Sequence, residues 1–280
     1  MNARYQLLAP IAQGGLGAVF RARDLQMGRE VAVKRVLAAK TGGCGAAADA
    51  LIREARQQSL LHHPNIAAVY DFGVDAEGAF IVMELISGET LEDTVARAPL
   101  PIPDFDALVR QTLAGVAAAH AQGILHLDLK PGNLMLHRLP DGGLEIKILD
   151  FGLARNTRQP ARRAAPARRE LPGSIHFMAP EQFEQHAPVD VRTDIYALGC
   201  IFYYALTRRH PFEGELTPQV IVAHLHHRTQ PLASLRPGLP AHTLQWVEWL
   251  IRRLPAGRPA SVAEALQVYE SGAPVPGATA

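Results

Sequence analysis

The first third of the chain alternates short apolar runs with glycine-rich or polar turns, a pattern typical of β-strands. One helix interrupts the strands at residues 50–61, with Asp49 as its expected N-cap and the proline of "HHPN" at its end. We therefore expect an N-terminal sheet that carries one helix. The runs that predict its strands are residues 5–11, 18–23, 31–37, 67–72 and 79–85.

The rest of the chain reads mostly as helices that bury one face. Residues 104–121 are the clearest case, with Asp104 as the expected cap. The longest apolar run, residues 195–206, is shorter than the roughly 20 residues that a bilayer span needs, so it predicts a buried core helix. Strands followed by helices predict two lobes. The apolar face of the first long helix carries Phe105, Leu108, Val109, Leu113 and Val116, and further helices are expected near 193–207, 217–226, 241–253 and 261–270.

The composition is that of an ordinary globular protein and narrows the class of partner. A length of 280 residues is enough for two separate cores. The net charge of +1 gives no overall field that would attract nucleic acid or membrane, so we expect neither as a partner. Cys44 and Cys200 match no metal spacing and no disulfide framework. We therefore expect a cytoplasmic location and no membrane segment.

Two polar stretches leave alternatives open. Residues 154–170, "ARNTRQPARRAAPARRE", contain six arginines and two prolines without apolar periodicity. They are either a solvated segment or a surface that attracts acidic protein substrates. The run "HLHH" at 224–227 has no metal-ligand spacing and is expected at the surface. The final "SGAPVPGATA" is expected to be a tail or the start of a linker.

The stretch "ILHLDLKPGNLML" at 124–136 places an acid, a base and an amide between two apolar flanks. Asp128 can accept a proton from an attacking hydroxyl group. Lys130 can stabilise charge on a transferring phosphoryl group, and Asn133 offers a hard oxygen ligand for Mg²⁺. The alternative is a polar turn that is only capped by its Asp and Asn side chains.

Three other segments favour the chemical interpretation. The strand-like "LEIKILDFG" ends in Asp150, a carboxylate beside a glycine. In "VAVK", Lys34 points away from the face of Val31 and Val33, toward the glycine-rich loop "AQGGLG", and Glu54 is its natural partner. Taken alone, a glycine-rich loop of this kind is more often only a hairpin turn, and it is neither a Rossmann nor a Walker motif. Two lysines and two oxygen ligands together describe a site for Mg²⁺ and ATP.

On the basis of these residues, the chain resembles a eukaryotic-type protein kinase of the sort also found in bacteria. The resemblance extends from Tyr5 to about Glu270. The resemblance implies an α+β, bilobal fold with ATP between the lobes. It places a small β-rich lobe at residues 1–86, a larger helical lobe at 87–270 and a flexible tail at 271–280. The motifs occur in the family's order: "AQGGLGAV", "VAVK", Glu54, "HPNI", "VMEL", "HLDLKPGN", "DFG", "APE", "TDIYALG" and "GRP".

The resemblance also assigns roles around the nucleotide. Gly14 and Gly17 would cover the phosphates, with Ala12 at the position of the family's first glycine. Lys34 would contact the α- and β-phosphates and pair with Glu54. The adenine would be held by Val19, Ala32 and Met135, with Met83 as gatekeeper and Glu84 to Ile86 as the hinge.

In the larger lobe the resemblance makes Asp128 the catalytic base and places Lys130 at the γ-phosphate. Asn133 and Asp150 would hold Mg²⁺, with Mn²⁺ as an alternative metal. Three structural contacts are implied as well: Glu181 with Arg258, Asp194 with the backbone of the catalytic loop, and Ser174 with Asp128 and Lys130.

One position departs from the family pattern. Leu127 stands where many members have an arginine that binds a phosphate on the activation loop. Between Gly152 and Gly173 the only hydroxyl side chain is Thr157, so targets for such phosphorylation are scarce. We therefore expect a serine/threonine protein kinase that acts on protein substrates without needing loop phosphorylation. A pseudokinase scaffold and a small-molecule kinase of the aminoglycoside type are the alternatives, and the oligomeric state is left open.

Overall fold

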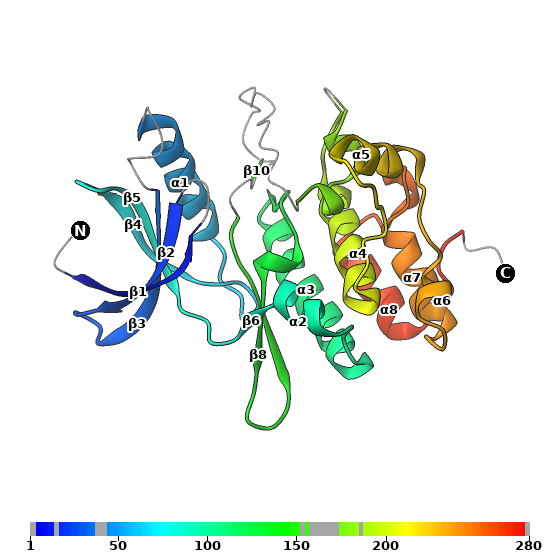
Figure 1. Ribbon diagram of the computed structural model, residues 1–280, viewed down its shortest axis with the longest axis horizontal. Helices are drawn as coiled ribbons and strands as arrows, with labels where there is room; N and C mark the ends of the chain where they lie inside the picture. The colour runs from blue at the N-terminus through cyan, green and yellow to red at the C-terminus, as the bar shows by residue number, and fades with distance from the viewer. Residues whose placement is uncertain are drawn as a thin grey trace.

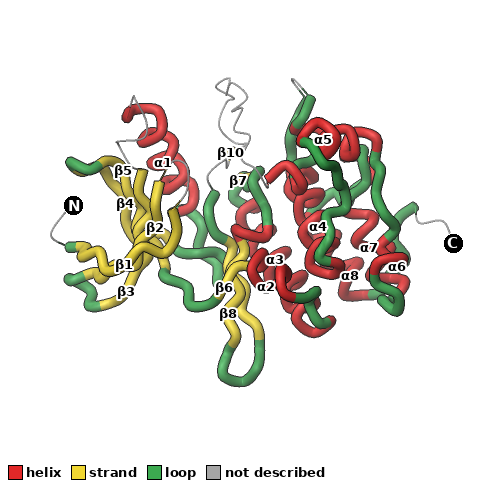
Figure 2. Tube along the Cα trace, viewed as in Figure 1, coloured by secondary structure: helices red, strands yellow, loops and turns green. Residues whose placement is uncertain are grey.

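The computed structural model describes residues 4–13, 17–36, 44–151, 155–156, 174–184 and 187–277. The N-terminal part forms an antiparallel sheet in the order β1-β2-β3-β5-β4, and helix α1 packs against it (Figures 1 and 2). The predicted sheet with one helix is therefore confirmed. Its elements are β1 (Tyr5–Gln13), β2 (Gly17–Asp24), β3 (Arg29–Val36), α1 (Cys44–Gln58), β4 (Val69–Asp75) and β5 (Gly78–Glu84).

Strand β3 divides the small lobe into two apolar clusters, as its alternating side chains require. Val31 and Val33 are fully buried on one face, with Phe80 and Val82 of β5. Ala32 and Val36 lie on the other face, packed with Leu51 and Ala55 of α1. Lys34 shares the face of Ala32, so the strand directs its ammonium group toward α1, as the sequence predicts.

Helix α1 begins earlier than the sequence pattern indicated. Asp49 lies inside the helix and not at its N-cap. The residues directly before Asp49 are Ala46, Ala47 and Ala48, and alanine has the highest helix propensity of all residues. The helix therefore extends back to Cys44.

The C-terminal part is mostly helical and begins with a small sheet in the order β6-β8-β9 (Figure 1). Two further short strands, β7 and β10, pair antiparallel with each other in a separate sheet. The bounds in this part are β6 (Glu89–Thr90), α2 (Leu91–Arg97), α3 (Ile102–Ala121), β7 (Ile124–Leu125), η2 (Pro131–Asn133), β8 (Leu134–Arg138), β9 (Leu144–Ile148), β10 (Arg155–Asn156), η3 (Ser174–Phe177), η4 (Pro180–Gln182), α4 (Val191–Thr207), α5 (Thr217–His226), α6 (Leu232–Leu235), α7 (Ala241–Leu250), η5 (Pro255–Gly257) and α8 (Val262–Ser271).

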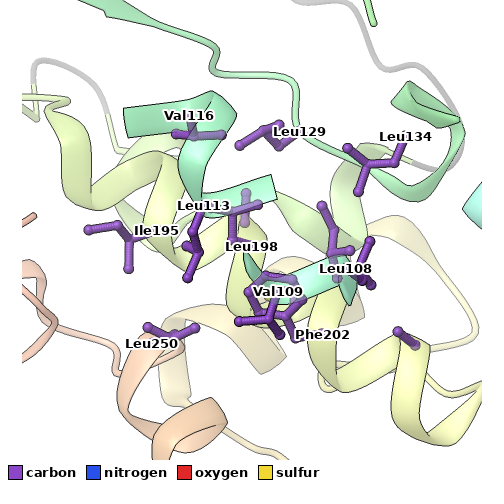
Figure 3. Packing of buried hydrophobic residues seen from close by; sticks show 14 of the residues in the cluster. Leu108, Val109, Leu113, Val116, Leu129, Leu134, Ile195, Leu198, Phe202 and Leu250 are labelled. Carbon is purple, nitrogen blue, oxygen red and sulfur yellow. The ribbon is translucent and has the colours of Figure 1, made fainter. Parts of the chain in front are cut away.

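One large apolar core holds the C-terminal part together. Helix α4 lies at its centre, and the run predicted as a buried core helix is indeed buried over almost its whole length. The predicted apolar face of α3 is confirmed, because all five of its side chains are at most 1% exposed. Figure 3 shows these faces meeting, with Leu108, Val109 and Leu113 of α3 close to Leu198 and Phe202 of α4.

Two local predictions in this part are wrong. Asp104 does not cap α3, because Pro101 occupies the N-cap and a proline stands in the first turn, where its missing N–H costs nothing. Asp104 instead forms an ion pair with Arg138, at 2.6 Å. His224 is fully buried and not at the surface, since α5 directs it toward α4, where its Nδ1 lies 2.8 Å from the hydroxyl of Tyr196. His226 and His227 of the same run are exposed.

Part of the segment predicted as a tail is buried. Val275 is 4% exposed and belongs to the large core.

In the described residues, no helix combines the length and the apolar character needed to cross a membrane.

Candidate active site

Lys34 stands at the meeting point of three elements. Its Nζ lies 2.7 Å from Oε1 of Glu54 on α1 and 3.0 Å from Oδ1 of Asp150, which follows β9. Residues that are far apart in sequence therefore converge, as the sequence predicts. This contact joins the N-terminal sheet to the C-terminal lobe. It is the arrangement on which the proposed phosphate chemistry depends.

Burial and ion pairing together determine the protonation of Lys34 and Glu54. Burial lowers the pKa of Lys34, but the carboxylates of Asp150 and Glu54 raise it more, so the ammonium group stays protonated at neutral pH. Burial raises the pKa of Glu54, and nearby Asp150 adds to this, while Lys34 opposes it. Of the three side chains Asp150 is the most exposed, at 36%. It is therefore the one most accessible to a ligand.

The loop between β7 and β8 is held from below by Asp194 of α4. This buried carboxylate accepts hydrogen bonds from the backbone N–H groups of His126 and Leu127, at 2.9 and 2.8 Å, and contacts Nε2 of His120 at 2.8 Å. Burial opposes its ionisation, but these donors and the nearby histidines lower the pKa of Asp194. The implied contact between Asp194 and the catalytic-loop backbone is present.

His126 supports the same loop from inside. The ring is 1% exposed and lies 4.5 Å from the ring of Phe151. Its Nε2 lies 3.1 Å from the carbonyl oxygen of Leu149, and its Nδ1 accepts a hydrogen bond from the backbone of Asp128. Burial lowers the pKa of His126, so the ring is neutral and bonds the backbone on both sides. His126 thereby fixes Asp128 relative to the end of β9.

The predicted acid and base lie together at the tip of this loop. Lys130 Nζ is 3.0 Å from Oδ2 of Asp128 and 3.1 Å from the hydroxyl of Ser174. The side-chain nitrogen of Asn133 donates to the backbone oxygen of Asp128, at 2.8 Å. Asp128 and Lys130 are 17% and 25% exposed, so both can meet a ligand. Of the implied contacts of Ser174, the one with Lys130 is present.

The donor set fits a divalent metal ion. Asp150 offers a partly exposed carboxylate, and Asn133 offers an amide oxygen, because its amide nitrogen is already bound to Asp128. Carboxylate and amide oxygens are ligands that Mg²⁺ accepts, with water and phosphate oxygens completing the shell. Asp150 has a φ of +47°, which lies in the left-handed region. The extended backbone of β9 therefore does not continue through Asp150.

The residues expected around a nucleotide lie on neighbouring strands. Val19 pairs with Lys34 between β2 and β3, and Ala32 pairs with Met83 between β3 and β5. Ala12 on β1 pairs with Val19. Met135 is partly buried on β8, and Glu84 and Ile86 follow at the end of β5, also partly buried. A Cβ atom at Gly17 would lie 2.1 Å from the backbone oxygen of Arg35, so the approach of β2 to β3 alone requires this glycine.

Some predicted features fall outside the described residues. Gly14 and Gly15 of the glycine-rich loop do so, as does Gly152 after Phe151. Thr157 and residues 158–170 of the arginine-rich segment also lie outside the described ranges.

The predicted tie between Glu181 and Arg258 is present and buried. The guanidinium binds both carboxylate oxygens, at 2.7 and 2.9 Å, and the side chain of Thr193 donates to the same carboxylate. Arg258 also donates to three backbone oxygens and covers the ring of Tyr196 at 4.6 Å. The segment around Glu181 is thereby fixed to the base of the C-terminal lobe.

Three supporting residues were missed by the sequence reasoning. His120 holds Asp194, and Gln182 donates to the backbone oxygen of Leu127 at 3.2 Å. Lys147 of β9 forms an ion pair with Glu84 of β5, at 2.7 Å. Lys147 lies three residues before Asp150, where the alternation of a strand places it on the face opposite its apolar neighbours. That position was the available signal, whereas the contacts of His120 and Gln182 arise only from the tertiary fold.

Comparisons with known proteins find one family over most of the chain. A family model described as "Protein kinase domain" matches residues 5–268. The chain is 33% identical over 266 residues to serine/threonine-protein kinase pkn2 of Myxococcus xanthus. The matched stretch covers 94% of this chain and 32% of that protein. The chain is 34% identical over 288 residues to serine/threonine-protein kinase PknA of Mycobacterium tuberculosis, covering 100% and 61%. Serine/threonine-protein kinase PrkC of Bacillus subtilis is 32% identical over 260 residues, covering 92% and 38%. The chain therefore spans between about a third and three fifths of the length of these relatives.

Proposed function

Because the chain belongs to the protein kinase family and resembles its bacterial serine/threonine members, we propose that it transfers the γ-phosphoryl group of ATP to serine and threonine hydroxyls of protein substrates. The observation that carries this proposal is the convergence of Lys34, Asp150, Asp128 and Lys130 from separate elements. Family membership implies the use of ATP and a divalent metal ion, and we propose that the metal is Mg²⁺.

Each residue has a defined task in this reaction. Asp128 orients the acceptor hydroxyl group and takes up its proton. Lys130, 3.0 Å from Asp128, stabilises charge on the phosphoryl group as it transfers. Lys34, fixed by Glu54, binds the phosphates that remain on the nucleotide. Asn133 and Asp150 would hold the metal ion, which supplies positive charge that neutralises the phosphates.

The nucleotide pocket is assigned from the strand positions. Val19, Ala32 and Met135 would enclose the adenine, with Met83 behind it and the backbone of Glu84 to Ile86 at its edge. Ala12, Gly14 and Gly17 would cover the phosphates. The division into lobes at residue 86 and a cytoplasmic location remain predictions.

Protein hydroxyls are preferred as acceptors over other classes of substrate. Lys130 and Ser174 are in contact, at 3.1 Å, and both match the serine/threonine pattern of the family. The motifs "DFG" and "APE" argue against a kinase of the aminoglycoside type. Lys34, Glu54, Asp128, Asn133 and Asp150 are all retained, which argues against a pseudokinase scaffold. A preference for acidic substrates stays a prediction, because most of the arginine-rich segment lies outside the described residues.

The reaction is further proposed to run without phosphorylation of the activation loop. Leu127 has no charge with which to bind a loop phosphate. Its backbone is held instead by Asp194 on the N–H side and Gln182 on the carbonyl side. The loop thus has two permanent supports that do not depend on a modification.

Replacement of the proposed base tests the function. Asp128→Asn should lower the rate of phosphate transfer from ATP to protein by roughly 10²–10⁴-fold, because the amide cannot take up the proton. The assay is incorporation of labelled phosphate into a mixture of cellular proteins, followed by identification of the modified residues. Asp141→Asn, at an exposed turn between β8 and β9, is the matched control and should keep full activity. An Asp128→Asn rate equal to that of the unaltered protein, or labelling of aminoglycosides alone, would contradict the proposal.

A further inference from the structure

Gln58, at the end of α1, is a buried polar side chain to which the proposed reaction gives no task. It follows Glu54 by one helical turn, so the two side chains lie on the same face of α1. The residue is 1% exposed, and its amide nitrogen donates a hydrogen bond to the backbone oxygen of Ala67, at 2.9 Å. Its amide oxygen is buried and has no hydrogen-bond partner among the described residues. The amide is therefore oriented by its bond to Ala67, which leads out of α1 to the next segment of the chain.

The burial of this amide has a cost that an apolar side chain would avoid. A buried amide that is paired at one end only loses part of the hydrogen bonding that water offers it. Methionine would fill a similar volume without the polar amide. What the amide supplies in return is a donor that reaches the backbone of Ala67. The bond itself, and not the bulk of the side chain, is therefore the property that distinguishes Gln58.

Ala67 extends this connection to the end of β9. Its backbone N–H donates to the backbone oxygen of Ile148, at 2.9 Å. The next residue, Leu149, donates from its backbone N–H to the backbone oxygen of Asn133, at 2.8 Å. Ile148 stands two residues before Asp150. The segment that Gln58 contacts is thereby joined to the strand end that leads to both expected metal ligands.

Glu54 and Asp150 are consequently connected by two routes. The direct route is the ammonium group of Lys34, which lies 2.7 Å from the first carboxylate and 3.0 Å from the second. The other route leaves Glu54 along one turn of α1 and passes through Gln58 and Ala67 to the end of β9. In the proposed reaction Lys34 also binds phosphates and Asp150 also binds the metal ion, so the direct route shares its charges with the substrate. The other route uses no group that is assigned to the substrate.

We infer that Gln58 is a positioning residue that keeps Glu54 and Asp150 at a fixed separation while the nucleotide is bound. This role rests on the proposed function, because it concerns the same site. A carboxylate in place of the amide would turn oxygen toward the oxygen of Ala67 and would place negative charge one turn from Glu54. The position therefore needs a donor without a charge, which the glutamine amide supplies.

The rate of phosphate transfer in a Gln58→Met variant tests this role. Methionine keeps the length and volume of the side chain but donates no hydrogen bond. The value of kcat should fall about 10-fold with little change in the KM for ATP, because the strands proposed to hold the adenine are not altered. Gln58→Glu should lower kcat further, because its charge acts against Glu54. Gln57→Met is the matched control and should retain full activity, since the neighbouring side chain is only partly buried.

Two measurements separate positioning from stability and from the proposed function itself. In urea, Gln58→Met should unfold at the midpoint of the unaltered protein, because it removes one unpaired oxygen, that of the amide, and leaves another, that of Ala67. In hydrogen exchange, the backbone N–H groups of Ala67 and Ile148 should exchange at least about 5-fold faster in this variant, with or without transfer activity. The N–H of Val82 in β5, which lies outside this route, should keep its rate.

Three results would overturn this role for Gln58. They are a kcat of Gln58→Met within about twofold of the unaltered value, a loss of activity matched by a fall in the urea midpoint, and unchanged exchange at Ala67 and Ile148. An unaltered protein that transfers no phosphate would instead contradict the proposed function. Faster exchange in Gln58→Met would then still establish the connection between α1 and β9.

Discussion

At the scale of single residues, Leu127 shows how a backbone position can be fixed without a charged side chain. Its φ is +61°, a conformation that non-glycine residues rarely adopt. Two hydrogen bonds stabilise this conformation. The backbone N–H of Leu127 donates to the carboxylate of Asp194, and the side chain of Gln182 donates to the backbone oxygen of Leu127. Asp194 and Gln182 belong to the same folded chain, so these hydrogen bonds need no added phosphate group. The shape of the catalytic loop is therefore set by the fold.

Because these two hydrogen bonds do not require a modification, we expect activity that does not depend on phosphorylation. Treatment of the purified protein with a phosphatase should change its rate of phosphate transfer by no more than about twofold, or roughly 0.4 kcal/mol of barrier. Mass spectrometry of Thr157 and Ser174 before and after treatment establishes that any phosphate was removed. A loss of 10-fold or more on dephosphorylation would show that the supports of Leu127 are insufficient.

At the scale of elements, a cluster of five aromatic rings joins the end of the activation segment to its supports. His176 of η3 stacks on His210, with ring centroids 4.0 Å apart, and His210 stacks on Tyr204 of α4 at 5.0 Å. His224 of α5 lies 4.3 Å from Phe212. The ionisable groups that act on this cluster from outside it are His227, which faces His224, and Glu92 and Arg208, which face Tyr204. Because Ser174 of η3 contacts Lys130, this packing supports the candidate active site.

The cluster predicts a loss of stability in acid. Burial lowers the pKa of His210 to about 4 and that of His224 to about 3, from an ordinary value of 6.5. Between pH 6.5 and 4 the unfolded chain therefore binds protons that the folded chain refuses. The free energy of unfolding should fall with decreasing pH by up to about 1.4 kcal/mol per pH unit for each ring. Urea unfolding at pH 7, 6, 5 and 4.5 measures this.

A variant assigns the effect to a particular ring. His210→Phe keeps an aromatic ring in the stack but removes its titration, so the dependence of stability on pH should become shallower. His226→Phe, on an exposed position of α5, should retain the slope of the unaltered protein. Equal slopes for His210→Phe and the unaltered protein would contradict the assignment.

The same elements show what the sequence could and could not predict. The strands and helices were predictable because Val31 and Val33, or the apolar face of α3, repeat at the period of a single element. The site was predictable because its motifs stand in order along the chain. The burial of His224 was not, because it depends on the packing of α5 against α4. Asp104 was misjudged because a local preference for acidic caps was outweighed by the prolines beside it.

At the scale of the whole molecule, each part of the chain has its own core, but Leu61 and Ile66 of the N-terminal part pack into the large core of the C-terminal part. Specific polar contacts join the two parts as well. Backbone bonds join Asn65 and Ala67 to Ile148 of β9. Lys34 reaches Asp150, and Lys147 reaches Glu84. Each of these contacts connects the segment that ends in Asp150 to the N-terminal part. The position of Asp150 relative to Lys34 is therefore set by this small group of interactions.

The ion pair of Lys147 and Glu84 can be tested as one of these connections. Its side chains are 12% and 24% exposed, so removal of either charge leaves the other poorly solvated. A double-mutant cycle with Lys147→Met and Glu84→Gln should give a coupling energy of about 0.5–3 kcal/mol in urea unfolding. Lys147→Arg should retain most of the stability, because it keeps the positive charge. The KM for ATP should rise more than kcat falls in Lys147→Met, since the pair supports the strand end proposed to hold the adenine and does not touch the reacting atoms. Strictly additive single effects, with no change in KM, would mean that the other contacts alone hold the two parts in place.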